Sequence, residues 1–546
     1  MRFIILILSM FCLADAQLSS GLRSYGGSNR DYLEKINFNP QNNMIFFTFA
    51  LSNSYKIDNS NGSDFLIISV TPFGSSIWER VIGVSNLNDW AYEIDFDANN
   101  NILVGGITCT PDGSIEWCSH LPSSINEGFV IKVNSNDGSI IRAIRIRDLF
   151  GNPSINNHLR ILSVKSTTDG GFVIGGEIQY EKQVCNNNNC YWANTTQGII
   201  AKFDSNMVLQ WSRVVGDTTS SSVFDYRGIV SVMQTGDNNI LAVSTARNGI
   251  WVGKFNVNNG SVIWQKFYNR TRNSSVSKLS WAKLTSNGNI IIADHIDNSG
   301  QHSDVLFVKL DANGNFSCAR RFGTYSNDVG IDVAYGINNY YITGFWYNGG
   351  SAGYLFYAKL DLNCNLLSVR YLEGIDAEGR GITVKGNIPY VVGWSNYQVW
   401  SNGDYDGILA ADSGIQDTCY WRTAIPDINQ SVSLSQGNVW SVYNANLQII
   451  NATYNSLPVN VAKKVRCGSL TPVNNDENNY EDCDIKIYSK KGYLEIISNN
   501  LNFIKIYDIT GRQVYSSKLK GKEKIYLKKG IYVVSFNGKM RKFIIN

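Results

Sequence analysis

The chain contains four histidines, and their spacing matches no standard catalytic or metal-binding set. They are His120, His158, His295 and His302. The last two bracket Asp297 in a segment that could hold a metal ion, but the spacing fits no common zinc pattern. We therefore expect His295 and His302 to be solvated loop residues, and we predict no metal site and no cofactor.

Three acids alternate along one predicted strand, namely Glu93, Asp95 and Asp97. Facing carboxylates of this kind can hydrolyse a glycosidic bond, although alternating acids more often solvate a strand edge. The segment Asp311–Asn315 resembles part of a calcium loop but lacks the later Glu, so it is interpreted as a turn between strands. No G-x-S-x-G nucleophile motif occurs. Whether the chain is an enzyme stays uncertain, and the residues favour a protein without catalytic activity.

Aromatic side chains gather in the segments expected to be long loops. Flat rings beside Asn and Asp can stack on sugars or anchor a protein partner. For any one ring, packing inside the fold is the competing interpretation. The predicted ligand-binding residues are Trp117, Trp192, Trp346, Trp394 and Trp400.

Two pairs of cysteines are close enough in sequence to suggest local disulfides in an exported chain. One pair is Cys109 and Cys118, and the other is Cys185 and Cys190. Cys318 and Cys364 are expected in neighbouring repeats at different heights and are not paired in this prediction. The pairing of Cys419, Cys467 and Cys483 is left open.

One pattern of an apolar strand, a polar turn and a second strand recurs seven times. Its clearest copy is Asp304–Gly323, with the turn at Asn313-Gly314. A lysine follows the first strand in five copies, and the last three steps between these lysines are 52, 55 and 50 residues. Three copies carry a tryptophan in the second strand, at Trp78, Trp211 and Trp264.

A second hairpin signal precedes each copy, with turns such as Asp169-Gly170 and Asn287-Gly288. Asn and Gly supply the positive φ that tight hairpins need. Four strands in about fifty residues, repeated, predict an all-β fold built as a β-propeller. We predict seven blades in residues 17–467, with eight as the alternative. Val432–Tyr443 is either the start of an eighth blade or a strand that clasps the ring.

The two ends of the chain predict export and a second domain. Residues 1–16 have a basic residue, a short apolar run and small residues before Gln17, which is typical of a signal peptide. No later segment is apolar enough to cross a membrane. Residues 468–483 are polar and acidic, and are predicted to be a linker.

Residues 484–546 hold 14 Lys/Arg and 4 Asp/Glu, a net charge of +10, whereas the whole chain is +3. The signal segment sums to zero, so residues 17–483 carry 3 − 10 = −7. A basic tail can bind nucleic acid or a membrane surface. Because apolar and basic residues alternate here, we expect the lysines to form the solvated face of a small β-sandwich, with no nucleic-acid partner.

The tail resembles the C-terminal sorting domain of type IX secretion in Bacteroidetes-type bacteria. The resemblance lies in Ile504–Val514, Leu527–Phe536 and Gly538–Ile545 at the end of the chain. It implies Sec export followed by passage across the outer membrane, with the secretion machinery as partner. The matching positions are Asp508, Gly511, Gly530, Tyr532, Lys539 and Lys542.

The ring resembles quinoprotein-like and delta-60-repeat-like propellers, and Asn256–Phe267 resembles their Gly-x-x-x-Trp repeat. Most copies lack the tryptophan, so this resemblance concerns the fold alone. Together these features predict a secreted or surface-attached binding or adhesion module for a glycan or protein. A polysaccharide hydrolase or lyase and a structural surface component are the alternatives.

Overall fold

The computed structural model describes residues 21–545, with gaps at 28, 40, 42–44, 53–54, 58–61, 72–75, 112–125, 149–157, 187–188, 217–227, 247–248, 271–279, 299–301, 348–352, 373–375, 397–404, 413–420, 460, 462, 468–478, 482–484, 491, 509–511 and 537–538. The described residues form 40 strands in eight sheets. They include no helix long and apolar enough to span a membrane. The predicted all-β fold class is confirmed.

Six sheets are each built from four consecutive antiparallel strands. The first three contain β2 Asp31–Phe38, β3 Ile45–Ser52, β4 Asp64–Val70 and β5 Ser76–Gly83; β6 Asn88–Phe96, β7 Ile102–Cys109, β8 Asn126–Val133 and β9 Ile140–Asp148; β10 His158–Ser166, β11 Phe172–Asn186, β12 Asn189–Phe203 and β13 Leu209–Gly216. The next three contain β14 Ser231–Gln234, β15 Ile240–Ala246, β16 Gly249–Phe255 and β17 Val262–Asn269; β18 Ala282–Leu284, β19 Ile290–Asn298, β20 His302–Leu310 and β21 Phe316–Gly323; β22 Val329–Tyr335, β23 Tyr340–Tyr347, β24 Gly353–Leu360 and β25 Leu366–Leu372.

A seventh sheet joins strands from three distant parts of the chain. Its order is β26 Ala377–Lys385, β27 Ile388–Ser395, β28 Asp406–Ala411, β1 Gly21–Tyr25 and β34 Lys463–Cys467. Leu22 of β1 stands opposite Ala410 on one side and Cys467 on the other. The first described strand therefore lies between two late ones, which closes the ring.

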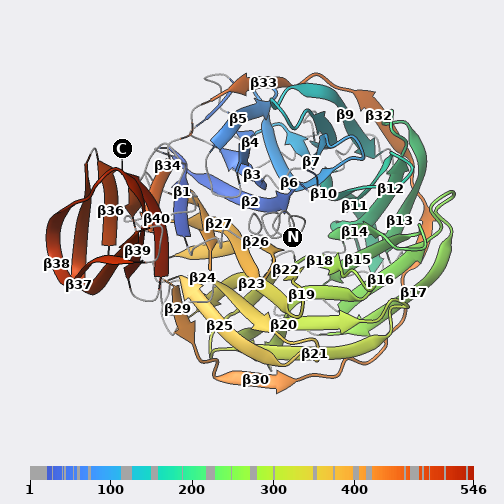
Figure 1. Ribbon diagram of the computed structural model, residues 1–546. Coiled ribbons are helices and arrows are strands. Elements are labelled where there is room, and N and C mark those ends of the chain that lie inside the picture. Colours follow the sequence, from blue (N-terminus) through green and yellow to red (C-terminus); the bar gives the residue numbers. More distant parts are fainter. Residues whose placement is uncertain are drawn as a thin grey trace, which may run out of the picture.

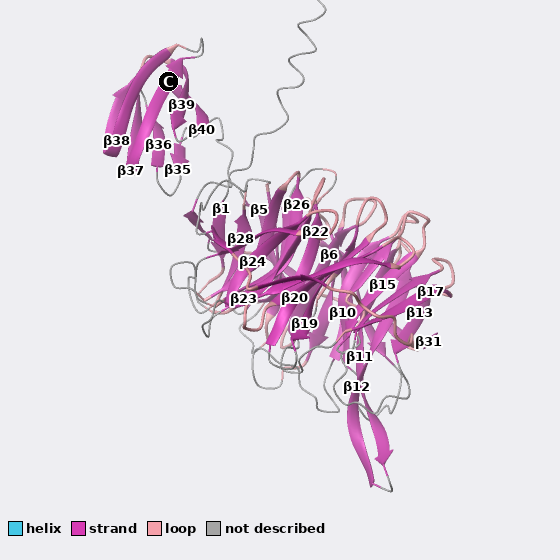
Figure 2. Cartoon of the chain, turned by 90° about the horizontal axis from the view of Figure 1, so that it is seen from below, coloured by secondary structure: helices cyan, strands magenta, loops and turns pink. Residues whose placement is uncertain are grey.

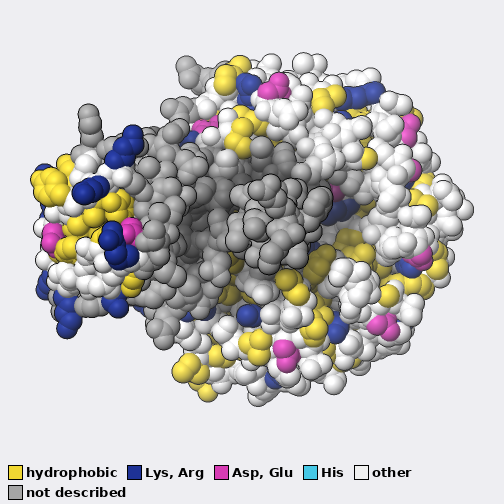
Figure 3. Space-filling model, in the orientation of Figure 1, with side chains coloured by type: hydrophobic (Ala, Val, Ile, Leu, Met, Phe, Trp, Pro, Cys, Tyr) yellow, Lys and Arg dark blue, Asp and Glu magenta, His cyan; other side chains and the backbone are white. Residues whose placement is uncertain are grey.

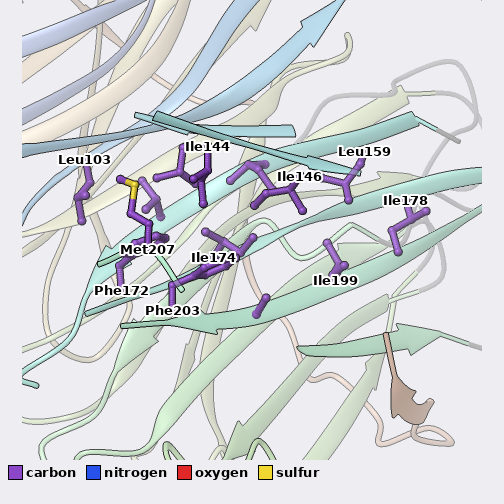
Figure 4. Packing of buried hydrophobic residues seen from close by; sticks show 14 of the residues in the cluster. Leu103, Ile144, Ile146, Leu159, Phe172, Ile174, Ile178, Ile199, Phe203 and Met207 are labelled. Atoms are coloured by element: carbon purple, nitrogen blue, oxygen red, sulfur yellow. The ribbon is translucent and has the colours of Figure 1, made fainter. Parts of the chain in front are cut away.

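The seven sheets stand side by side around a common axis as a multi-blade β-propeller (Figure 1). Their innermost strands neighbour one another in the order β2, β6, β10, β14, β18, β22 and β26, and β26 lies beside β2. The core fills the spaces between sheets. Figure 4 shows one such layer, in which Leu103, Ile144 and Ile146 of one sheet pack on Phe172, Ile174 and Phe203 of the next. Burying each of these side chains contributes about 1.5–3 kcal/mol.

Residues 421–467, here called the belt, run around the outside of the ring in the reverse of the sheet order (Figure 1). Belt strands add a fifth strand to six sheets, β34 among them, and Gln436 bridges to Tyr268 in the remaining one. Val432–Tyr443 lies within the belt, so it clasps the ring and does not begin another sheet. The other belt strands are β29 Trp421–Ala424, β30 Ile428–Ser431, β31 Ser441–Asn444, β32 Leu447–Asn451 and β33 Asn455–Pro458.

The two faces of the ring differ. On one side, here called the turn face, the strands are joined by short hydrogen-bonded turns such as Asp97–Asn101 and Asp311–Asn315. The opposite side, the loop face, receives the connections from second to third strand and from sheet to sheet. There the hairpin of β11 and β12, whose strands are 15 residues each, projects beyond the ring (Figure 2).

The recurring tryptophans link neighbouring sheets. The indole N–H of Trp78 donates to the Ser135 carbonyl of the next sheet at 2.9 Å, and Trp211 donates to Val257 at 2.7 Å. Each ring also packs against a glycine of that next turn, Gly138 or Gly260, whose φ is 74° or 65°. A Cβ there would meet the ring within 3 Å, so the tryptophan and the next turn's glycine depend on each other.

The eighth sheet belongs to the C-terminal residues, and its strands pair only with one another among the described residues. β37 bends near Ser498 and pairs with β36 before the bend and β39 after it, as expected for a small β-sandwich. Its core contains Ile487, Ile496, Ile506 and Val534. The strands are β35 Asn479–Glu481, which falls in the predicted linker, then β36 Ile485–Lys490, β37 Tyr493–Asp508, β38 Gln513–Tyr526, β39 Gly530–Phe536 and β40 Lys539–Ile545.

Candidate functional site

Charged side chains of the innermost strands meet near the axis of the ring, where five of these seven strands are distorted. The pairing register shifts around Glu34 of β2, Tyr92 of β6, Leu162 of β10, Ile331 of β22 and Arg380 of β26. A bulge adds an unpaired residue and re-aims its neighbours. The charged residues that meet near the axis, here called the axial cluster, are Glu34, Lys35, Glu93, Asp95, Arg160, Lys165, Glu177, Lys283, Asp332, Glu378 and Arg380.

One half of the axial cluster is built on arginines. Arg380 pairs with Glu34 at 3.1 Å and with Glu378 at 2.9 Å. Arg160 pairs with Glu177 through its guanidinium. The carboxylates are almost fully buried, at 2% exposed for Glu177 and 3% for Glu34. Buried carboxylates of this kind need such partners, because burying an uncompensated charge is costly.

The other half is built on lysines. Lys35 lies 3.2 Å from Asp332, and its ammonium sits 4.0 Å from the centre of the Trp281 ring. Lys283 lies 3.7 Å from Asp332 and donates to the Ile382 carbonyl at 2.9 Å. Lys165 pairs with Asp95 at 2.9 Å. These contacts link side chains of different sheets, so they hold the inner ends of the sheets in register.

Electrostatics in the axial cluster favour the charged forms of Asp332 and Lys165, but not of Lys283. Burial alone would raise the pKa of Asp332, but Lys283 and Lys35 outweigh that effect and lower it. Burial would lower the pKa of Lys165, but Asp95 and Glu93 raise it to about 12. Burial lowers the pKa of Lys283 despite the nearby Asp332 carboxylate. A general acid needs a raised carboxyl pKa, and Asp332 is shifted the opposite way.

A second set of acids lies where one sheet passes to the next. Asp89 accepts from the Val84 N–H at 2.8 Å and from the Thr108 hydroxyl at 2.6 Å. Asp328 accepts from the Thr324 and Tyr347 N–H groups. Burial raises the pKa of Asp89 to about 8 and that of Asp328 to about 7. Their bonds go to the chain's own loops, so they hold the junctions between sheets.

The predicted aromatic residues do not form one described surface. Trp346 of β23 is 2% exposed and packs on Phe322 and Phe356 in the core, so its ring does not face solvent. Trp394 of β27 is half-buried between Tyr32 and Tyr405 in edge-on contacts. Trp192 stands opposite Gln183 in the projecting part of β12. Trp117 and Trp400 lie outside the described residues.

The histidine expectation was wrong. His295 lies on β19 and is fully buried beside Asp294, with 3.7 Å between its Nδ1 and a carboxylate oxygen. His302 begins β20 and is 8% exposed. Both belong to strands of a packed sheet, so they are buried among neighbouring side chains although the sequence around them is polar. Within the described ranges, no group of three or more His, Cys, Asp or Glu side chains could hold a metal ion.

The predicted acids divide between two roles. Glu93 and Asp95 belong to the axial cluster, whereas Asp97 pairs with Lys132 at 3.1 Å and caps its own turn. Asp311 also caps a turn, accepting from the Asn313 and Asn315 N–H groups. The carboxylate of Asp311 therefore binds its own turn, in agreement with the interpretation of Asp311–Asn315 as a turn between strands.

The decision not to pair Cys318 with Cys364 was wrong, because the two form a disulfide. Cys318 stands at the tryptophan position of its unit, and Cys364, with φ of 66°, stands at the glycine position of the next turn. The bond therefore replaces the tryptophan–glycine contact seen elsewhere. Aligning both cysteines with Trp264 and Gly314 would have revealed the pair from the sequence.

The other predicted disulfides stay predictions. Cys109 is disulfide-bonded, but its predicted partner Cys118 lies outside the described residues. Cys185 stands directly opposite Cys190 in the β11–β12 hairpin. Cys467 stands opposite Leu22, whereas Cys419 and Cys483 lie outside the described residues.

The described residues of the tail motif lie on or beside strands of the C-terminal sheet. Asp508 ends β37 and bonds Arg512 across the following turn, and Gly511 lies outside the described residues. Gly530 begins β39, and the Tyr532 hydroxyl donates to the Lys528 carbonyl at 2.9 Å. Lys539 and Lys542 stand on β40 opposite Phe536 and Val533.

Comparison with known proteins gives distant likeness alone. No family model and no curated protein matches the chain. Solved structures with a similar chain path include the Dos1 propeller (9% identity, TM-score 0.31, 72% of this chain and 95% of that one). Another is Drosophila Semaphorin 1b extracellular domains 1-2, with 10% identity, a TM-score of 0.28, and 71% of this chain and 87% of that chain covered. A third is a Trypanosoma rangeli sialidase in complex with 2,3-difluorosialic acid, with 9% identity, a TM-score of 0.28, and 95% of this chain and 84% of that chain covered. The fold assignment rests on this chain's own strand pairing.

Proposed function

We propose that this chain is an exported binding module, a seven-bladed ring whose loop face binds a glycan or a surface protein without chemically changing it. Each of the seven sheets of residues 21–467 is taken as one blade. The propeller fold is compatible with binding and with glycan hydrolysis, so the choice depends on the sites.

The observation that supports binding is the difference between the two faces. The turn face consists of short turns that satisfy their own hydrogen bonds, such as Asp361–Asn365. The loop face carries the longer connections and the β11–β12 hairpin, which extends seven residue pairs past Gln179 and Thr196. Such a projection adds no core to the ring, and binding surfaces are often built from segments of this kind on a rigid scaffold.

The axial cluster gives less support to hydrolysis. Retaining and inverting glycosidases need two carboxylates with different protonation states flanking the substrate. Here Asp332 is held by Lys35 and Lys283, Asp95 by Lys165, and Glu34 by Arg380. In these ion pairs the charges at the ring centre compensate one another and join different sheets.

Export is part of the proposal. The Cys318–Cys364 disulfide suits an oxidising compartment. The resemblance of the tail to sorting domains supports delivery by type IX secretion to the cell surface or medium. If so, a chain that lacks residues 484–546 should remain in the periplasm of a host with that machinery.

The test removes the hairpin and leaves the ring. Residues 180–195 are replaced by Asn-Gly, so that Gln179 and Thr196 flank a tight turn. We expect binding in a glycan-array and cell-surface screen to fall at least about tenfold, with circular dichroism unchanged, because the ladder from Phe172 to Gln179 is kept.

Two single variants refine this result. Trp192→Ala should weaken binding, whereas Leu362→Ala, an exposed turn-face change, should not. Unchanged binding after hairpin removal would contradict the proposed face. Release of shortened sugar chains from any bound polysaccharide would overturn the non-catalytic assignment.

A further inference from the structure

β38 of the C-terminal sheet carries an uninterrupted row of lysines. Lys518, Lys520, Lys522 and Lys524 occupy alternate positions and are all exposed, while Leu519 and Ile525 between and beside them are buried in the sandwich core. Alternate residues of a strand share a face and lie about 7 Å apart. The four lysines, here called the lysine row, therefore follow β38 over at most about 20 Å. The row bends at Gly521, whose φ is 97° and which lies opposite Ser498 at the bend of β37.

The lysine row lies on an open edge. β38 pairs only with β37 among the described residues, so its other side carries no strand. Lysines on such an edge discourage strand-to-strand aggregation. Figure 3 shows basic side chains over this part of the molecule with few acidic ones.

Two acids adjoin the lysine row. Glu495 lies 3.0 Å from Lys522, while Glu523 stands opposite the buried Ile496 and so faces inward. Residues 484–546 are +10 and residues 17–483 are −7. Solvation alone does not require one domain to gather positive charge in this way, whereas attraction of a polyanion does.

A pair of tyrosines ends the row. The Tyr526 ring is 75% exposed and lies 5.4 Å from the Tyr493 ring, and Lys524 sits 5.2 Å from Tyr493. An exposed ring beside cations can stack on the C–H face of a sugar while the lysines pair with its carboxylates.

We propose that the lysine row and the Tyr493–Tyr526 pair bind a linear acidic polysaccharide, a chain of uronic acid residues lying along β38. This second site is independent of the loop face, and it gives the C-terminal sheet a ligand of its own.

The test measures binding of the full chain to polygalacturonate at about 50 mM salt. Fully methyl-esterified polygalacturonan, which carries no charge, is the control polymer. Lys518→Gln/Lys520→Gln should weaken binding up to about tenfold, and Tyr526→Ala should weaken it further. The control Lys528→Gln/Lys529→Gln removes the same charge from exposed residues outside the row and should change binding less than twofold.

Several outcomes would overturn the proposal. Equal losses in the two double variants would show diffuse charge attraction, and equal binding of the esterified polymer would exclude carboxylate recognition. Tighter, row-dependent binding to phosphatidylglycerol vesicles would make the partner a lipid surface. Absence of polygalacturonate binding would remove the site, whatever the hairpin experiment shows.

Discussion

At the scale of single residues, the Cys318–Cys364 disulfide performs the task of a tryptophan and a glycine. It joins β21 to the turn that begins β25, across two neighbouring sheets, with 6.3 Å between the Cα atoms. Arg320 reinforces the junction by donating to the Cys364 carbonyl at 3.0 Å. A covalent bond and an indole contact thus occupy equivalent positions in one ring.

Removing the disulfide should destabilise the ring. Cys318→Ser/Cys364→Ser opens a cross-link across 46 residues, and we expect a loss of roughly 3–4 kcal/mol in guanidinium unfolding. Cys318→Trp/Cys364→Gly restores the arrangement of neighbouring units and should recover part of that loss. The reduced natural chain is the control for the serine variant. Equal stability of the oxidised natural chain and the serine variant would contradict the assigned role.

Asp89 should make stability depend on pH. Its folded pKa is about 8 against an ordinary 3.8, so the folded state holds a proton that the unfolded state has lost. Stability from this group therefore falls as pH rises from about 4 to about 8. Asp89→Asn should cost less unfolding free energy at pH 8 than at pH 5.

The matched control is Asp361→Asn. The pKa of Asp361 is lowered because N–H donors of Asn365 and Asn363 outweigh its burial, so it is ionised in both states at pH 5 and pH 8. Its cost should be the same at the two values. A pH-independent cost for Asp89→Asn would refute the buried-proton account.

At the scale of elements, local and distant pairing differ in what a sequence reveals. The hairpins follow from turns such as Asn313-Gly314, because turn residues and flanking apolar runs adjoin in the chain. The belt strands are four or five residues long and mostly exposed or only partly buried, as in β30 and β32. Strands this short carry little local signal, so Val432–Tyr443 could only be left between two interpretations.

The site was hidden for a related reason. Glu93 and Asp95 could be picked out because they alternate on one strand. Their companions Lys165, Lys283 and Asp332 come from other units, and only ring closure brings them together. The bulges that aim them leave no turn residue in the sequence.

The belt should be required for the ring, whereas the C-terminal sheet should not. A chain ending at residue 467 keeps every ring sheet complete, and its melting temperature should stay within a few degrees. A chain ending at residue 420 lacks the belt, uncovers Trp251 where Trp440 stacks on it, and leaves β1 without β34. We expect aggregation or early melting, measured by size exclusion and circular dichroism. Equal melting of the two truncations would contradict the belt's role.

At the scale of the whole molecule, two parts of opposite charge carry two different kinds of surface. The ring, at −7 with its linker, offers a projecting hairpin, and the C-terminal sheet, at +10, offers a row of lysines. The composition reveals the charge contrast. It does not reveal which lysines share one line, since that depends on the inward turn of Leu519, Glu523 and Ile525.

The disulfide also restricts how this repeat array can grow. Three units meet the next through residues that any copy could supply, a tryptophan on one side and a glycine on the other. The unit with Cys318 can be followed only by the unit with Cys364. A duplicate of either one, inserted elsewhere in the ring, would carry a thiol whose partner is already bonded. These two units can therefore be copied or exchanged only together, while units joined by tryptophan and glycine can be shuffled one at a time.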